Sequence, residues 1–393
     1  MPRKPLQKSI ISLSVAAASL SAPQVVSAET IAEAFSAGKA SLNMRYRYES
    51  VEDNVNEDAD AHTLRSRLGF TTGSYKDFKA HADFEVINTG GDFNSGTNGE
   101  TEYAKVVDPK DEELNQAWLS YSGISDTEVK LGRQRIIIDN ARFVGNVGWR
   151  QNEQTFDAFK ITNKSFEDVE ITLAQIEQID TITGGETDVS HTLLNVGIDK
   201  TPVGKISAYG YLLDEDDSEA DTDTFGMRLK GSAGSFLYTL EAAQQTDAAD
   251  NSADISATYM FGEAGYKMDS TKVFLGYESL GSDDGDYGFQ TPLATKHAFN
   301  GWADKFLATP ADGLVDTYVK VVSKFAGMKL VGMYHDFSSD EGSTDYGTEL
   351  DLVLVKPINK TFKGLIKYAD YSADDFSDDT TKIWVALEAN FKQ

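Results

Sequence analysis

Strict alternation of apolar and polar residues runs along much of this chain. In the stretch 42–49, LNMRYRYE, the apolar set Leu42, Met44, Tyr46 and Tyr48 alternates with polar and charged residues. A period of two places the two sets on opposite faces of an extended strand. The pattern therefore predicts strands that each have one apolar and one charged face.

The same alternation returns in about eighteen segments of roughly ten residues, the length a tilted strand needs to cross a bilayer. Clear examples are 63–70, 78–86, 272–279, 348–354 and 382–391. Helical periodicity does not extend beyond two turns anywhere in the chain. The pattern favours an all-β protein.

The connections between these segments alternate between two kinds. One kind is short, at 73–77, 122–126, 163–168, 200–205, 231–234, 267–271, 325–329 and 358–364. The other is longer and acidic, at 51–61, 88–112, 138–153, 178–190, 214–223, 282–312, 338–345 and 372–379. Short periplasmic turns opposite long extracellular loops are typical of outer-membrane barrels. We therefore expect a transmembrane antiparallel β-barrel of about 18 strands.

In such a barrel the apolar faces meet lipid and the charged faces meet a water-filled lumen, so no conventional core is expected. The ring must close, because an open sheet edge in hydrocarbon leaves backbone groups without hydrogen bonds at several kcal/mol each. A soluble β-sandwich is the alternative for alternating strands. The number of even segments, the asymmetry of the loops and the aromatic Phe391 near the C-terminus favour the barrel.

The N-terminal residues predict export. Arg3, Lys4 and Lys8 precede a short apolar run, and the small residues at 26–28 fit a cleavage site, so 1–28 is expected to be a signal peptide and 29–393 the barrel. Its removal takes three basic residues from the formal charge of -27, which leaves -30. The chain has no cysteine, so no disulfide stabilises the exported protein.

Three stretches, 131–161, 297–321 and 334–354, are specific enough to compare with known families. Together with 63–73 and the C-terminal 367–391 they resemble the alginate-export family of outer-membrane porins, and the likeness covers about residues 40–393. The resemblance implies a barrel with a solute-conducting lumen. It also implies an alternative function, the export of an anionic polysaccharide such as alginate with periplasmic partners.

Arginines on the charged strand faces are the first candidates for the solute path. Arg45, Arg47, Arg65 and Arg67 fall on the lumen faces of two neighbouring strands, where a positive ladder would concentrate anions. The alternative is that they pair with lumen carboxylates. The expected pore-lining residues are Arg45, Arg47, Arg65, Arg67, Lys79, Arg133, Arg135, Arg142, Arg150, Glu349 and Asp351.

Arg133 and Arg135 would face lipid if alternation continued strictly from Leu131. A bulge at Gly132 would return both to the lumen, and glycine is common at such bulges. The family resemblance implies that the following loop folds towards the pore and carries Arg142, Trp149 and Arg150. An ordinary extracellular loop is the alternative.

The longest loop contains HAFNGWAD, residues 297–304. His297 and Asp304 lack the spacing of a metal site and no second histidine is near, so the loop is expected to act as a plug through His297, Phe299, Trp302 and Asp304. No nucleophile elbow, zinc motif or phosphate loop occurs in the chain. The protein is therefore expected not to be an enzyme, and no cofactor or metal is predicted.

The acidic loops raise the question of calcium. The stretch 214–223, DEDDSEADTD, offers oxygen ligands but lacks the glycine and the terminal glutamate of a calcium-binding hand. Solvated loops, or loops bridged by divalent cations to lipopolysaccharide, are the favoured interpretation.

The sequence thus predicts a passive outer-membrane channel of a Gram-negative bacterium for small anionic or saccharide-type solutes. The expected surroundings are lipid and lipopolysaccharide, the assembly is a monomer or a trimer, and no nucleic acid is involved. An outer-membrane barrel enzyme and a plugged receptor or adhesion barrel are the alternatives from other classes. The five histidines show no obvious nucleophile partner for the enzyme.

Overall fold

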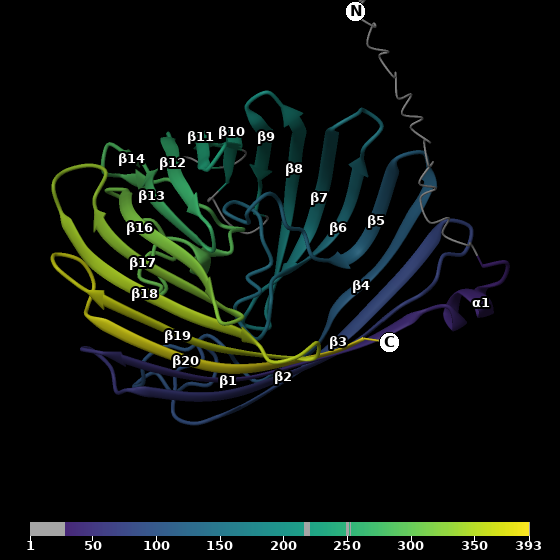
Figure 1. The fold of residues 1–393 in the computed structure, drawn as a ribbon, viewed down its shortest axis with the longest axis horizontal. Helices are drawn as coiled ribbons and strands as arrows, with labels where there is room; N and C mark the ends of the chain where they lie inside the picture. Colours follow the sequence, from purple (N-terminus) through teal and green to yellow (C-terminus); the bar gives the residue numbers. More distant parts are fainter. Residues whose placement is uncertain (1–27, 216–220, 249–250, 252, 393) are drawn as a thin grey trace, which may run out of the picture.

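A single closed β-sheet dominates the computed structural model, which describes residues 28–215, 221–248, 251 and 253–392. Its 18 strands pair antiparallel with their neighbours in chain order, and the first strand also pairs with the last along 41–53, which closes the ring. Figure 1 shows the resulting barrel, with the C-terminus at the same end as the short helix that precedes the first strand.

The barrel strands, in chain order, are β1 (Lys39–Asp53), β2 (Ala59–Thr71), β3 (Phe78–Gly90), β4 (Asp111–Ile124), β5 (Thr127–Gln134), β6 (Thr155–Asn163), β7 (Val169–Asp180), β8 (Glu186–Thr201), β9 (Gly204–Leu213), β10 (Thr222–Ala233), β11 (Phe236–Asp247), β12 (Ser256–Met268), β13 (Thr271–Leu280), β16 (Leu314–Phe325), β17 (Met328–Ser338), β18 (Asp345–Pro357), β19 (Phe362–Ser372) and β20 (Thr380–Lys392). A small hairpin, β14 (Ser282–Asp283) with β15 (Tyr287–Gly288), lies in the loop between β13 and β16.

The predicted barrel, its strand number and its alternation of short turns with long loops are confirmed. Several long loops are shorter than expected, because strands extend into them, whereas the loops 135–154 and 281–313 are slightly longer than expected. β7 ends at Asp180 and β8 begins at Glu186, which leaves only 181–185 where a loop over 178–190 was predicted. The segment 248–255, between β11 and β12, is a further connection on the long-loop side that the pattern did not indicate.

The two faces of the strands differ as the alternation predicts. On β2, Leu68 is 61% exposed at the outer surface, whereas its neighbour Arg67 is 9% exposed. On β20, Leu387 is 44% exposed and Trp384 is fully buried. Apolar side chains therefore cover the outside of the barrel and polar ones point into it.

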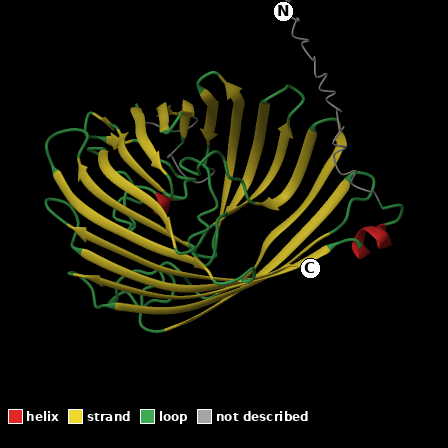
Figure 2. Ribbon diagram, in the orientation of Figure 1, coloured by secondary structure: helices red, strands yellow, loops and turns green. Residues whose placement is uncertain are grey.

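The expectation that the barrel has no apolar core is wrong. Two long loops fold into the barrel interior, and we call them the first inner loop (135–154) and the second inner loop (281–313) (Figure 2). They bring Ile136, Phe143 and Phe289 into one buried apolar cluster with inward-facing strand residues. Apolar loop residues need burial, and the interior of a wide barrel offers it.

Helical structure is confined to two short pieces, α1 (Ile31–Ser36) and the 3₁₀ helix η1 (Lys296–Ala298). Alternation analysis missed α1, whose capping box joins Thr30 and Glu33. Among the residues described here, no helix is long and apolar enough to cross a membrane. The expected signal peptide lies outside the described residues except for Ala28.

Adjacent positions on β18 test the assignment of the two faces. Leu352 is 46% exposed on the outer face, while Val353 points into the barrel. Leu352→Arg should destabilise the barrel by about 2–4 kcal/mol, because its charge enters hydrocarbon near the midplane. Val353→Arg should cost much less, since its charge reaches water. Unfolding in urea from lipid vesicles measures both, and equal destabilisation would mean that the faces are wrongly assigned.

Candidate functional site

The first inner loop crosses the barrel and is anchored to strands on several sides. Arg45 of β1 donates from Nη1 to the carbonyl oxygen of Gly148 at 3.0 Å. Ser207 of β9 donates to Oδ1 of Asp139 at 3.1 Å, and Nε of Arg142 donates to Oε1 of Glu278 on β13 at 2.6 Å. A loop held by β1, β9 and β13 must span the lumen and narrow it.

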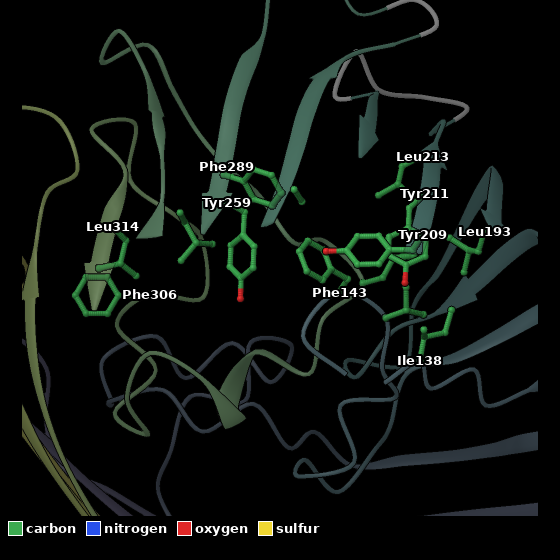
Figure 3. Packing of buried hydrophobic residues seen from close by; sticks show 14 of the residues in the cluster. Ile138, Phe143, Leu193, Tyr209, Tyr211, Leu213, Tyr259, Phe289, Phe306 and Leu314 are labelled. Carbon is green, nitrogen blue, oxygen red and sulfur yellow. The ribbon is translucent and has the colours of Figure 1, made fainter. Parts of the chain in front are cut away.

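Aromatic packing fixes the middle of this loop. The ring of Phe143 lies 5.1 Å from that of Tyr209 and 5.2 Å from that of Tyr259, centroid to centroid (Figure 3). Phe289 of the second inner loop lies 6.0 Å away on an edge-to-face contact. The two inner loops thus pack on each other as well as on the wall.

Arg47 of β1 is almost completely buried beneath the first inner loop. Its Nη1 donates to the carbonyl oxygen of Trp149 at 2.7 Å, and its guanidinium lies over the indole ring of Trp149. Its Nη2 forms an ion pair with Asp108, while Glu49 lies 3.6 Å from its Nε. Arg47 therefore joins the wall to two loops.

Arg65 and Arg67 of β2 make similar contacts. Arg65 donates from Nη2 to Asn43 Oδ1 at 2.6 Å, and its Nε lies 3.8 Å from Glu85. Arg67 pairs with the same Glu85 and reaches Glu153 of the first inner loop at 2.8 Å. The alternative to a free positive ladder, pairing of the arginines with lumen carboxylates, is thus present in the described contacts with Glu49 and Glu85.

Burial makes these pairs important to the position of the loop. Arg45 and Arg65 stand directly opposite each other on β1 and β2, where like charges repel. Interleaved carboxylates offset this repulsion. Burial tends to raise the pKa of Asp108, yet the guanidinium groups of Arg47 and Arg150 hold it below its ordinary value. Asp108 therefore carries a negative charge beneath the first inner loop.

Arg150 extends this network to the second inner loop. Its Nη1 lies 3.3 Å from both carboxylate oxygens of Glu49, and its Nη2 donates to Asp304 Oδ2 at 3.0 Å. Lys382 of β20 donates to the same Asp304 oxygen at 3.2 Å. One wall and both inner loops are therefore tied through a few buried charges.

The predicted bulge at Gly132 is absent. Register continues without a shift from Leu131 to Arg133 against both β4 and β6. Gly132 instead has a φ of +109°, and a Cβ there would lie 2.3 Å from the Ala117 carbonyl oxygen. Arg133 stays on the face of Leu131, near the loop end of β5, where Asp157, Asp180 and Glu186 surround it.

Arg135, by contrast, lies with the interior residues. Its guanidinium pairs with Glu153, the carboxylate that also pairs with Arg67. Arg133 needs no inward turn, because three carboxylates already neutralise it. Arg133 and Arg135, two positions apart in the sequence, therefore do not share one environment.

The second inner loop is held to β18 through its backbone. Trp302 N–H donates to Glu349 Oε1 at 2.5 Å, and Ala303 N–H donates to the same oxygen at 2.7 Å. Trp302 N–H also lies 3.2 Å from Asp351 Oδ2. Gly301 permits this approach, since a Cβ at its position would lie 2.2 Å from Glu349 Oε2. Glu349 and Asp351 thus anchor a loop.

His297 connects the same loop to β19. Its Nδ1 lies 2.6 Å from Asp304 Oδ1, and its ring stacks on Trp149 at 4.6 Å. Its Nε2 faces the ammonium group of Lys367, which lies 3.8 Å from the ring centroid of Trp302. Burial holds the pKa of His297 well below its ordinary value, despite Asp304. The imidazole is therefore neutral and packs as part of the loop anchor.

Phe299 lies on the same loop, 4.9 Å below the guanidinium of Arg142. The candidate residues of the second inner loop are thus brought together, as a packed unit against the wall. Among the residues described here, no group of three or more histidine, aspartate or glutamate side chains is placed to hold a metal ion. Half of the acidic stretch 214–223, residues 216–220, lies outside the described residues.

A cavity of about 590 Å³ lies beside the inner loops, on the side of the short turns. Trp149, His297 and Trp302 line it from the loops. Inward-facing residues of β10–β13 and β16–β19 form the rest of its wall. We call this cavity the vestibule, because it lies between the inner loops, which narrow the lumen, and the periplasmic end of the barrel.

Lysines without ion pairs occupy the lumen face in this half of the barrel. Lys79, one of the expected pore-lining residues, lies on β3 opposite Ser120. Strand alternation places five others on the same face, and none of the six has a carboxylate partner among the described residues. We call this set the lumen lysines: Lys79, Lys230, Lys267, Lys272, Lys324 and Lys329.

Sequence reasoning missed several residues that hold the site together. Asp108 and Glu153 lie in loops without any motif, and only their pairing with Arg47 and Arg67 shows their role. Lys367 alternates on its strand like any lumen residue, and nothing in the sequence places it among tryptophans. Such contacts join strands far apart in the chain.

Comparisons with known proteins agree with this architecture. The alginate-export family model matches residues 39–277, more than half of the chain. No curated protein sequence matches the chain.

Solved structures with similar folds are outer-membrane proteins. OccK5 (OpdH) of Pseudomonas aeruginosa is 14% identical, with a TM-score of 0.70 over 92% of this chain and 99% of its own. OpdK of the same organism, solved with vanillate, is 14% identical with a TM-score of 0.69, covering 91% of this chain and 100% of its own. OccAB4 of Acinetobacter baumannii is 13% identical with a TM-score of 0.69, covering 91% of this chain and 98% of its own. At these identities the likeness shows the fold.

None of these matches is to an enzyme. The closed barrel, its apolar outer surface and the family match lead to one conclusion. The chain belongs to the alginate-export family and is a porin-like channel of the Gram-negative outer membrane.

Proposed function

We propose that this channel conducts small anionic solutes by passive diffusion, through a lumen that the two inner loops narrow. The observation that carries the proposal is the set of lumen lysines. In a chain with a formal charge of -27, six inward-facing lysines have no carboxylate partner in the described residues. Cations near low-dielectric walls attract anions and raise their local concentration.

Two strand pairs place these lysines where they repel one another. Lys267 stands directly opposite Lys272, and Lys324 stands directly opposite Lys329. Like charges directly opposite on a sheet are destabilising. An anion that passes between two such lysines reduces their repulsion. The opposed lysines therefore attract permeating anions.

The arginines have a different part in this proposal. Arg45, Arg47, Arg65 and Arg67 were expected to form a free positive ladder, but the described contacts neutralise much of their charge. They line the path at the constriction chiefly as the support of the first inner loop. Acidic outer loops act over only about 8 Å at physiological salt. The lumen lysines lie towards the short-turn end of the barrel, away from these loops, and therefore set the ion preference.

Export of an anionic polysaccharide is the second candidate, because the family is described by alginate export. A polymer would need the inner loops to move aside while it passes. Polyuronate added to the periplasmic side of a planar bilayer should then block the current at low concentration. A channel for small solutes shows no such block.

The charge preference is tested by reversal potentials in a salt gradient. The wild-type channel should prefer chloride over potassium. Lys267→Ser combined with Lys272→Ser should shift the reversal potential towards the cation value, since two unpaired lumen cations are lost. Lys356→Ser with Lys360→Ser is the matched control, because it removes two exposed charges at the same end outside the lumen. Cation preference in the wild type, or equal shifts in both variants, would contradict the proposal.

The support given by Arg47 is tested separately. Arg47→Ser removes one of the two arginines beside the buried Asp108 and Glu49 and leaves only Arg150, and breaking a buried pair costs up to about 3–5 kcal/mol. The first inner loop should loosen, so single-channel conductance should rise and fluctuate, while heat-modifiable migration of the barrel on gels stays unchanged.

Arg47→Lys is the control for this change, since it keeps the charge and loses the forked hydrogen bonding. Its conductance should lie between those of wild type and Arg47→Ser. Unchanged conductance in Arg47→Ser would show that Arg47 does not hold the loop.

A further inference from the structure

One side of the vestibule is apolar, although its residues stand on the lumen face of the barrel. Met333 of β17, Val353 and Val355 of β18, and Leu365 of β19 all line the cavity. They share the inward face with His335, Asp351 and Lys367 by strict alternation. Porin lumens are polar, so a run of aliphatic residues on this face is unexpected.

Strand register makes these residues one continuous surface. Val353 stands directly opposite Val331, and Val355 stands directly opposite Leu365. Val331 in turn stands opposite Val322, and Leu365 opposite Ala386, both on the lumen face. We call Val331, Met333, Val353, Val355 and Leu365 the apolar wall. It spans three neighbouring strands, and all of its residues except Val331 line the vestibule.

The charged groups around the same cavity are almost all engaged. Glu263 pairs with Lys320, Glu278 pairs with Arg142, and Asp316 pairs with His335. Lys230 of β10 is the exception among the exposed cations that line the vestibule, with no ion pair in the described part of the chain. It is also directly opposite Lys205 on β9. An available positive charge therefore faces the same cavity as the apolar wall.

From this juxtaposition we infer that the vestibule binds small amphipathic organic anions. The hydrocarbon part lies on the apolar wall and the carboxylate is directed to Lys230. The inference rests on the proposed function and names the solute class for it. A heavily hydroxylated uronate gains nothing from an aliphatic surface, because its hydroxyl groups would lose water there without finding partners.

Cavity size fits a single small molecule. A volume of about 590 Å³ is within the range of sites for drug-sized ligands. The apolar wall is one side of the vestibule and does not enclose it, so binding is weak and the solute can leave again. Weak binding is a requirement for conduction.

Two ring carboxylates of similar size test the inference. Cyclohexanecarboxylate and glucuronate each carry one carboxylate on a six-membered ring, but only glucuronate carries hydroxyl groups. Each is added from the periplasmic side to wild-type channels in planar bilayers, and the concentration that halves the chloride current is measured. Cyclohexanecarboxylate should act at about a tenfold lower concentration, which is about 1.4 kcal/mol.

Variants locate the two contacts. Val353→Ser with Leu365→Ser should remove the difference between the two anions and leave the chloride conductance in place. Leu237→Ser is the matched control, an aliphatic lumen residue on β11 that does not line the vestibule. Lys230→Ser should weaken block by both anions several-fold.

Other results would overturn this inference without contradicting the proposed function. Equal block by both anions, or an unchanged preference in the Val353→Ser, Leu365→Ser variant, shows that the apolar wall does not select solutes. Equal block by the neutral cyclohexylmethanol shows that no anionic group is recognised. In all these cases the anion preference in salt gradients is measured independently. Only loss of that preference would contradict the proposed function itself.

Discussion

Backbone hydrogen bonding in hydrocarbon is the constraint on which the rest of this structure depends. Every peptide group that crosses the membrane must find a partner within the protein, and a closed ring of strands provides one for each. Pairing of β1 with β20 along most of their length completes that ring. Closure with 18 strands creates an interior too wide for the strand side chains alone to fill. What fills it determines what the channel can pass.

Two loops fill it, and buried charge holds them. Arg47, Arg67 and Arg150 each join a carboxylate of the wall or of another loop, while Glu349 accepts two consecutive N–H groups from the second inner loop. Such buried ion pairs add little stability compared with apolar packing, but removing one partner of a pair strongly destabilises the fold. They therefore keep the loops in one position. In the function we propose, the positive charge available to a permeating solute is that of the lumen lysines.

Alternation alone could predict the barrel, its strand number and the inward direction of Arg45 and Arg67, because period and loop length are local properties of the sequence. The path of the inner loops could not be derived in this way. Contacts such as Arg142 with Glu278 join residues 136 positions apart, and their partners carry no motif. The separation of Arg133 from Arg135 also escaped prediction. A glycine at positive φ and a bulge leave the same sequence signature.

The most direct test of this account is a double-mutant cycle across the lumen, read by single-channel recording. Arg142→Met and Glu278→Gln each remove the ion pair between the first inner loop and β13, and both should increase conductance fluctuations. The double variant should be no worse than either single one, because residues in contact have non-additive effects. Additive effects would show that the loop does not reach the opposite wall, and would contradict the account.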